Sequence, residues 1–176
     1  MKNEKNFQRF VKLRLGLSDF DIELGSREDA EHASNLMTEQ AQDTLDILSR
    51  NLDPALYEQT AFLNNLSRLC VRNRKARIRF LVQQPADAVK RCQRLLELAR
   101  KLSSSIELRQ PHADYRQHNE AFLVADRCGL IYRKLSDRYE GTANFYAPVE
   151  AQRKTDFFTE VWDRSEIHPE FRRLYL

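Results

Sequence analysis

The stretch RIRFLVQQPADAVKRCQRLLELARKLSSSIELR, residues 77–109, decides the fold class. Its first part, 77–82, reads as a strong strand, because β-branched and aromatic apolar residues alternate with arginines and then continue as Leu81 and Val82. Pro85 then begins a helix, since proline suits the first helical position. The apolar residues of this helix recur at helical spacing: Val89, Cys92, Leu95, Leu96, Ala99 and Leu102. Residues 106–109 form the next strand, so the stretch predicts parallel strands joined across a covering helix.

The same alternation extends upstream. Residues 20–24 alternate apolar and acidic side chains, which predicts a half-buried strand. Ser26 can cap the helix that follows, and residues 44–48 form a second strand. Asp53 and Pro54 then begin another helix, with Asp53 as its cap.

Downstream the pattern changes. Two strands at 121–125 and 130–132 flank a turn, which predicts a β-hairpin. A polar loop from 136 to 148 leads to a final helix that carries Phe157, Phe158, Val161 and Trp162. The expected fold is α/β, with a mixed, mostly parallel sheet flanked by helices.

Composition indicates one globular domain. The chain has 176 residues, 41% hydrophobic and 31% charged, and no apolar run approaches the roughly 20 residues of a spanning helix. Residues 1–18 lack a clear period and are expected to be an N-terminal arm or edge segment before a domain at 19–176. The N-terminus is charged and leads into no apolar core, so we expect a cytoplasmic protein rather than a secreted one.

The cysteines and histidines do not predict a cofactor or a metal. Cys70, Cys92 and Cys128 are odd in number, and no CxxC pair occurs, so we expect reduced, structural thiols. His112 and Asp114 lie near a further histidine, but loop histidines at this spacing are common.

The charge balance is weak evidence for any partner. The net charge is +3 and the pI near 8.8. Two basic clusters occur, and they consist of Lys2, Lys5, Arg9, Lys12 and Arg14, and of Arg68, Arg72, Arg74, Lys75, Arg77 and Arg79. Each is either ordinary solvated surface or a patch that faces phosphate or nucleic acid.

Ligands of open α/β sheets bind beyond the carboxyl ends of the parallel strands. That rule places one set of polar side chains near a common edge: Arg50, Asn51, Gln83, Gln84 and Arg109. His118 precedes its strand, so it reaches this edge only if that strand runs antiparallel or its loop folds over.

Three features resemble the phospholipase D superfamily. His118 stands at the start of a strand, residues 141–144 read Gly-Thr-Ala-Asn after a hairpin, and a later helix carries Phe158 and Trp162. The family has a His-x-Lys-x4-Asp motif and a Gly-Ser-x-Asn segment at these places. The resemblance implies a phospholipase D-like half-domain in which the histidine attacks phosphorus and the lysine holds phosphate oxygens.

The chain departs from this motif. Glu120 occupies the lysine position, Ala125 the aspartate position, and Asp126 comes one residue late. Because Glu120 repels phosphate where positive charge is needed, the motif is degenerate. We therefore predict a binding or regulatory module for a phosphate-bearing ligand, for nucleic acid or for a protein partner. The predicted ligand-binding residues are Asn51, Arg109, His118, Thr142 and Asn144.

Two alternatives remain. A metal-independent phosphodiesterase would use His118 as its catalytic residue and would need a homodimer, since the chemistry takes two motifs. The chain also resembles an uncharacterised bacterial family of phospholipase D-like domains associated with GNAT acetyltransferases, through residues 52–57, 102–104, 136–141 and 171–174. That resemblance implies an interaction domain for an acetyltransferase partner. The chain has no glycine-rich acetyl-CoA loop of its own.

Overall fold

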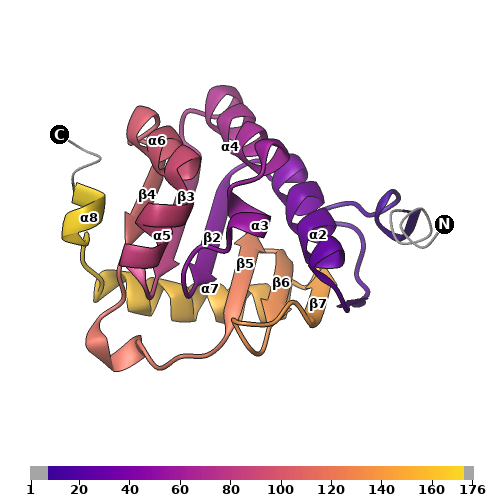
Figure 1. Cartoon of the computed structure of the whole chain (residues 1–176). Coiled ribbons are helices and arrows are strands. Elements are labelled where there is room, and N and C mark those ends of the chain that lie inside the picture. The colour runs from indigo at the N-terminus through magenta and orange to yellow at the C-terminus, as the bar shows by residue number, and fades with distance from the viewer. Residues whose placement is uncertain (1–7, 173–176) are drawn as a thin grey trace.

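The computed structural model describes residues 8–172, which form one open seven-stranded sheet with helices on both faces (Figure 1). The strands are β1 (Ile22–Leu24), β2 (Thr44–Ser49), β3 (Arg77–Val82), β4 (Ile106–Arg109), β5 (Ala121–Ala125), β6 (Gly129–Arg133) and β7 (Gly141–Asn144). The helices are α2 (Arg27–Gln40), α3 (Pro54–Tyr57), α4 (Thr60–Arg72), α5 (Pro85–Arg91), α6 (Gln93–Lys101), α7 (Pro148–Asp163) and α8 (Pro169–Arg172), with a 3-10 turn at Ala113–Tyr115. Lys2, Lys5 and the end of the 171–174 stretch lie outside the described residues.

The strand order is β1-β7-β6-β5-β2-β3-β4. β2, β3 and β4 pair in parallel because helices cross over between them. All other pairings are antiparallel. The predicted mixed sheet with flanking helices is confirmed, but its parallel part is smaller than expected. β1 does not join that part, because it pairs with β7 at the sheet edge.

The direction of β5 decides where His118 lies. β5 runs antiparallel to β2, with Phe122 opposite Leu48. The start of β5 therefore lies at the edge where β2 and β3 end. This meets the condition under which His118 reaches the carboxyl edge of the parallel strands.

The two faces of the sheet bury separate cores. The larger core lies under the α2–α6 side, and α7 crosses the opposite face alone among the described helices (Figure 1). The smaller core, under α7, consists of Leu48, Leu81, Phe122, Val124, Ala151, Phe158, Val161 and Trp162. Strand side chains alternate between the faces, so every second residue of β5 and β6 points toward α7.

A buried ion pair also lies under α7. Two nitrogens of Arg79 contact the two carboxylate oxygens of Asp46 at 2.7 and 2.9 Å. The guanidinium stacks on Phe158 and Trp162, 4.9 and 5.3 Å from the ring centres. Arg79 is therefore not part of a surface patch, and the second basic cluster is divided between two faces of the sheet.

Short polar contacts set the element ends. Ser26 caps α2 by accepting a hydrogen bond from the Asp29 amide, and Asp53 caps α3, as predicted. Asp126, at the turn of the β5–β6 hairpin, accepts hydrogen bonds from three consecutive backbone amides, those of residues 42–44, at 2.8 to 2.9 Å. Asp126 thus lies at the far end of β5 from His118. It serves the fold and cannot take the motif aspartate's place beside that histidine.

The prediction of a polar loop from 136 to 148 missed β7. Its four residues, Gly-Thr-Ala-Asn, carry no apolar pattern, and only pairing with β6 and β1 makes them a strand. A Cβ at Gly141 would collide with the Tyr132 carbonyl oxygen, so glycine permits the close approach of β7 to β6.

Residues 8–18 form a helical turn and irregular turns. Phe10 and Leu13 are buried in the larger core, and the Gly16 amide donates to the Phe145 carbonyl. Cys70 and Cys92 are free and buried, and burial raises the pKa of the Cys92 thiol to about 12. No helix within residues 8–172 combines the length and the apolar character needed to cross a membrane.

Candidate functional site

His118 lies in the segment that leads into β5 and is held from two sides. Its ring stacks on Phe157 of α7, with ring centres 4.7 Å apart. Its backbone carbonyl accepts a hydrogen bond from the Gln83 side chain at 2.7 Å. The imidazole Nε2 lies 2.9 Å from a carboxylate oxygen of Glu120, and the side chain is 38% exposed. His118 thus has a fixed position on the α7 side of the sheet edge.

Glu120 is held by two ionisable partners that carry or can carry positive charge, and by the Tyr132 hydroxyl. Lys154 of α7 donates to both carboxylate oxygens, at 2.8 and 2.9 Å, and His118 contacts one of them. Burial alone would raise the pKa of Glu120, but the contacts with Lys154 and His118 outweigh it and hold this pKa below its ordinary value. The carboxylate of Glu120 therefore engages His118 and Lys154, the two groups that would otherwise be free to contact a phosphate.

Lys154 is itself enclosed by aromatic rings. Its ammonium lies 4.6 Å from the centre of the Tyr132 ring and 5.5 Å from that of Phe122. Its side chain is 25% exposed, against 13% for Glu120. Burial and the charge of Glu120 raise the pKa of the Tyr132 phenol, which stays a neutral donor at physiological pH. The ion pair of Glu120 and Lys154 is therefore mostly shielded from water, in a wall of side chains between α7, β5 and β6.

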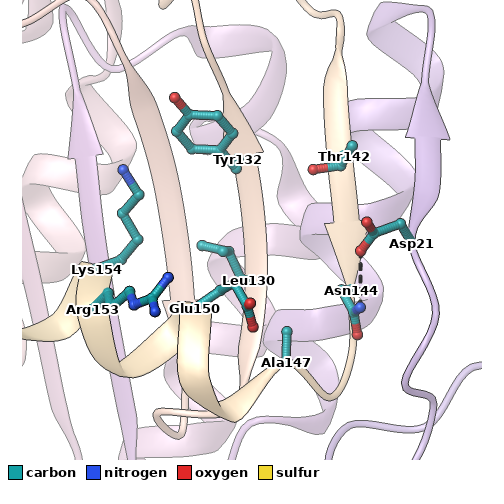
Figure 2. A pocket seen from close by; sticks show the side chains of 9 residues that line it. All are labelled: Asp21, Leu130, Tyr132, Thr142, Asn144, Ala147, Glu150, Arg153 and Lys154. Carbon is teal, nitrogen blue, oxygen red and sulfur yellow. Dashed lines mark hydrogen bonds between the residues drawn. The ribbon is translucent and has the colours of Figure 1, made fainter.

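Thr142 and Asn144 line a pocket beside this wall, which we call the face pocket (Figure 2). Its volume is about 480 Å³, and its lining consists of Asp21, Leu130, Tyr132, Thr142, Asn144, Ala147, Glu150, Arg153 and Lys154. Figure 2 shows Arg153 and Lys154 on the α7 side and Asp21 on the opposite side, with β6 between them. Glu150 lies on the α7 side as well, so that wall carries two cations and a carboxylate and faces the carboxylate of Asp21.

The polar groups of the face pocket differ in how far they are already engaged. Asn144 donates to Asp21 at 2.9 Å, and its oxygen accepts from the Tyr146 amide. Arg153 is exposed, and its side chain makes no hydrogen bond or ion pair within residues 8–172. Thr142 lies two residues from Asn144 on the same face of β7, opposite Tyr132. Arg153 is thus the cation of this pocket that is available to a ligand.

The structure does not bring the five predicted ligand residues together. Thr142 and Asn144 share the face pocket, whereas His118 lies at the sheet edge. Arg109 packs on Trp162, 4.5 Å from its ring centre, and its Nε contacts Glu107 at 2.7 Å. Asn51 lines neither this pocket nor the edge cavity described below. The arginine near Thr142 and Asn144 is Arg153, from α7, which supplied none of the predicted ligand-binding residues.

Lys154 and Arg153 were missed for a structural reason. Lys154 precedes Phe157 and Phe158 by three and four residues, so it shares their face of the helix. That spacing was available in the sequence as a signal. What the sequence did not reveal was the long-range contact of Lys154 with Glu120, 34 residues away.

A second cavity lies at the carboxyl edge of the parallel strands, and we call it the strand-end basin. Its volume is about 530 Å³, and its lining consists of Arg50, Gln83, Gln84, Arg116, Gln117 and Asn119. Arg50 follows β2, and its guanidinium donates to the Asn119 side-chain oxygen at 2.8 Å. The edge position predicted for Arg50, Gln83 and Gln84 agrees with this cavity.

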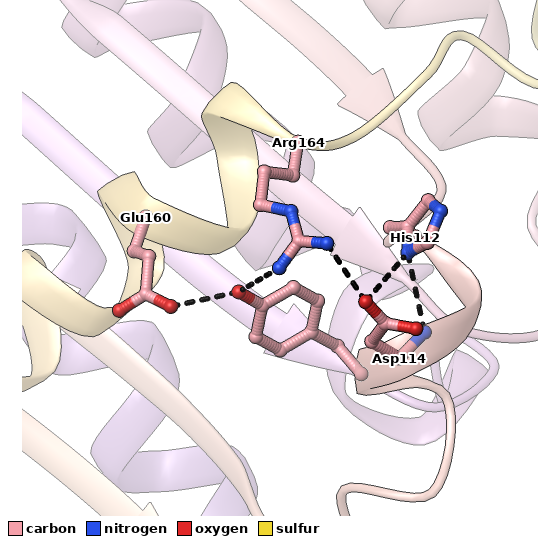
Figure 3. A network of polar contacts seen from close by, with 5 residues as sticks. His112, Asp114, Glu160 and Arg164 are labelled. Atoms are coloured by element: carbon pink, nitrogen blue, oxygen red, sulfur yellow. Dashed lines mark hydrogen bonds and ion pairs between the residues drawn. The ribbon is translucent and has the colours of Figure 1, made fainter.

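A surface network fixes the loop between β4 and β5 (Figure 3). Arg164 contacts Asp114 at 2.7 Å and donates to the Tyr115 hydroxyl, which donates to Glu160 of α7. His112 contacts the same carboxylate of Asp114 at 3.2 Å. Within the described part of the chain, no three His, Cys, Asp or Glu side chains are grouped to hold a metal. The network attaches the loop that carries His118 to α7.

The fold is similar to that of a solved phospholipase D family member and to that of a second bacterial protein. The phospholipase D family member Nuc from Salmonella typhimurium has a TM-score of 0.57 and 10% identity, over 77% of this chain and 88% of that one. NucT from Helicobacter pylori has a TM-score of 0.60 and 8% identity, over 85% of this chain and 98% of that one. The predicted phospholipase D-like fold is thereby supported.

A third solved structure covers more of this chain. The archaeal chromatin protein TrmBL2, whose structure shows a mode of DNA binding, has a TM-score of 0.63 and 13% identity. The match covers 95% of this chain and 61% of TrmBL2. No curated protein matches the sequence significantly. A family model matches residues 26–174, and the chain therefore belongs to the family described as domain of unknown function DUF7931.

Proposed function

We propose that this chain is a catalytically silent phospholipase D-like module that binds the phosphate groups of nucleic acid. One observation carries the proposal: the carboxylate of Glu120 stands at the motif's lysine position and is held by His118 and Lys154. The face pocket beside it offers a free guanidinium, that of Arg153, to a ligand.

Catalysis on a phosphodiester needs a free nucleophile and positive charge near the phosphate oxygens. Glu120 opposes both requirements. Its carboxylate contacts the Nε2 of His118 and neutralises the ammonium of Lys154, and it adds a negative charge of its own. A phosphate approaching His118 would therefore meet a carboxylate, which argues against phosphoryl transfer at this site.

Binding needs only a free cation and hydrogen-bond donors, and the face pocket offers these in Arg153 and Thr142, beside the carboxylates of Glu150 and Asp21. Arg153 can contact phosphate oxygens in a bidentate manner, and the Thr142 hydroxyl can add a donor. Asp21, on the facing wall, suits the hydroxyl groups of a sugar rather than a second phosphate. One nucleotide of a strand would thus lie with its phosphate toward α7 and its sugar toward β1. The likeness to a DNA-binding chromatin protein also favours nucleic acid as the ligand.

Salt-dependent binding tests this proposal. A fluorescent single-stranded oligonucleotide is titrated with the wild type, with Arg153→Ala and with a control, Arg100→Ala, between 50 and 200 mM salt. Like Arg153, Arg100 is exposed, on α6, and has no side-chain hydrogen bond or ion pair within the described residues. Each variant therefore loses one positive charge and no contact within the fold. We expect Arg153→Ala to weaken binding and to reduce the salt slope by about 0.7 to 1, while Arg100→Ala leaves both unchanged. A wild-type affinity that is weak and independent of salt would contradict the proposal.

The two alternatives make other predictions. A homodimeric phosphodiesterase would hydrolyse a diester without metal, in a reaction that needs His118. An interaction domain would co-purify with an acetyltransferase and bind no oligonucleotide. The binding module predicts neither result.

A further inference from the structure

We propose that the strand-end basin binds a nucleotide that carries a terminal phosphate, and that it distinguishes the base by its edge. The ligand is either a free nucleoside monophosphate or the phosphorylated end of a single strand, since both present the same groups. The choice of nucleic acid rests on the proposed function, but this site is separate from the face pocket.

The lining of the basin is unusual in composition. Six residues line it, two of them arginines and four of them carboxamides, and none is acidic or apolar. A terminal phosphate carries a charge of about −1.5 to −2 at neutral pH, which Arg50 and Arg116 together can balance. Because no carboxylate lines the basin, nothing there repels that charge. A volume of about 530 Å³ falls within the usual range for small-ligand sites.

The floor of the basin is fixed before a ligand arrives. Gln83 is only 5% exposed, and its side-chain nitrogen donates to the His118 carbonyl at 2.7 Å. The backbone amide of Gln84 donates to the backbone carbonyl of Arg50 at 2.7 Å, and this bond joins the end of β3 to the end of β2. Arg50 in turn contacts Asn119, which precedes β5. Three chain segments thus converge because β5 runs antiparallel to β2.

The rim, in contrast, is free to engage a ligand. Arg116 and Gln117 are exposed, and their side chains make no hydrogen bond or ion pair within residues 8–172. A carboxamide presents a donor and an acceptor side by side, which matches the donor and acceptor pattern along a base edge. No aromatic ring lines the basin. Stacking on an aromatic ring, which would bind all four bases alike, therefore does not contribute to the affinity. The chemistry therefore favours recognition of the base edge with the phosphate held by the arginines.

The test is a calorimetric titration of the full chain with each of the four nucleoside 5′-monophosphates. Inorganic phosphate, the unphosphorylated nucleosides, and hexanucleotides with and without a 5′-phosphate are titrated in parallel. We expect the monophosphates to bind with affinities that spread about fivefold or more between bases. Phosphate alone and nucleosides alone should bind at least about tenfold more weakly, because each lacks one half of the contacts. A preference for phosphorylated over unphosphorylated hexanucleotides identifies strand ends, and its absence identifies the free nucleotide.

Variants locate the site. Arg116→Ala should weaken monophosphate binding about fivefold, since a partly exposed charge-assisted contact is lost. Gln117→Ala should reduce the spread between bases, and Arg153→Ala, in the face pocket, should change neither. Equal affinity for all bases and for phosphate alone would overturn the inference, as would a loss of binding in Arg153→Ala only.

The inference and the proposed function can fail separately. Monophosphate binding without salt-dependent oligonucleotide binding would keep the basin and reject the proposed function. Oligonucleotide binding that depends on Arg153, with no monophosphate binding, would keep the proposed function and reject the basin.

Discussion

Replacing Glu120 by glutamine tests the contacts of this carboxylate with Lys154 and His118. The change removes one negative charge and keeps the size of the side chain. It leaves the Lys154 ammonium without its partner and releases His118 from a carboxylate. The variant should therefore bind oligonucleotides more tightly and unfold more readily.

The size of the stability loss follows from burial. Glu120 and Lys154 are 13% and 25% exposed, and two charge-assisted contacts to the lysine are weakened. Such contacts contribute about 1.5–3 kcal/mol each, but desolvation offsets part of that, so we expect a loss of about 2 kcal/mol in the free energy of unfolding at pH 7. Urea denaturation followed by circular dichroism measures it.

The loss should depend on pH. The pKa of Glu120 in the folded chain lies below its ordinary value of 4.5, so the folded state favours the ionised form. The stabilisation is therefore fully present above the unfolded pKa and disappears as the pH falls through the folded pKa. Wild type and Glu120→Gln should differ at pH 7 and converge in stability well below pH 4.5.

Oligonucleotide affinity supplies the second readout. Removing a negative charge beside Lys154 should tighten binding about threefold or more at 50 mM salt and less at 200 mM, because salt screens the gain. Glu97→Gln is the matched control, since Glu97 pairs with Lys101 on the exposed side of α6 and its replacement changes the net charge equally. An equal gain in both variants would refute the reasoning, because it would reflect net charge alone.

Three further predictions concern the framework of the site. Asp126→Ala removes the acceptor for three backbone amides at the start of β2 and should cost about 2 kcal/mol in urea denaturation, whereas Arg127→Ala, in the same turn, should cost less than half as much. Gly141→Ala should separate β7 from β6, because its Cβ would meet the Tyr132 carbonyl oxygen; a loss of about 1–3 kcal/mol and faster amide exchange at residues 142–144 are expected, and an unchanged melting temperature would contradict this reading. Cys92 should resist iodoacetamide at pH 8 in the folded chain and react only on unfolding, because its thiol is buried with a pKa raised to about 12; rapid labelling of native protein at Cys92 would show the opposite.

Local patterns in the sequence predicted the alternation of strands and helices and the hairpin. The strand pattern at 77–82 and the caps at Ser26 and Asp53 are short-range signals, and the structure bears them out. Local patterns could not give the direction of β1, since that strand pairs with a segment about 120 residues away. They also missed β7, whose four residues become a strand only between two partners.

The same distinction explains the site. The sequence identified Glu120 as the departure from the motif, and the edge rule placed Arg50, Gln83 and Gln84 correctly. It grouped Arg109 with Thr142 and Asn144, whereas Trp162 and Glu107 engage Arg109 elsewhere. The partner of Glu120 comes from α7, and only the packing of that helix on the sheet brings Lys154 to it. Residue identity suggested the chemistry, and tertiary contacts determined which residues share it.

The most direct test of the central claim is hydrolysis of bis-p-nitrophenyl phosphate in the presence of EDTA, with wild type and His118→Ala compared. If the carboxylate of Glu120 silences the motif, neither protein should release nitrophenol above the buffer rate. Hydrolysis by the wild type that survives EDTA and disappears in His118→Ala would contradict that claim and establish His118 as a nucleophile.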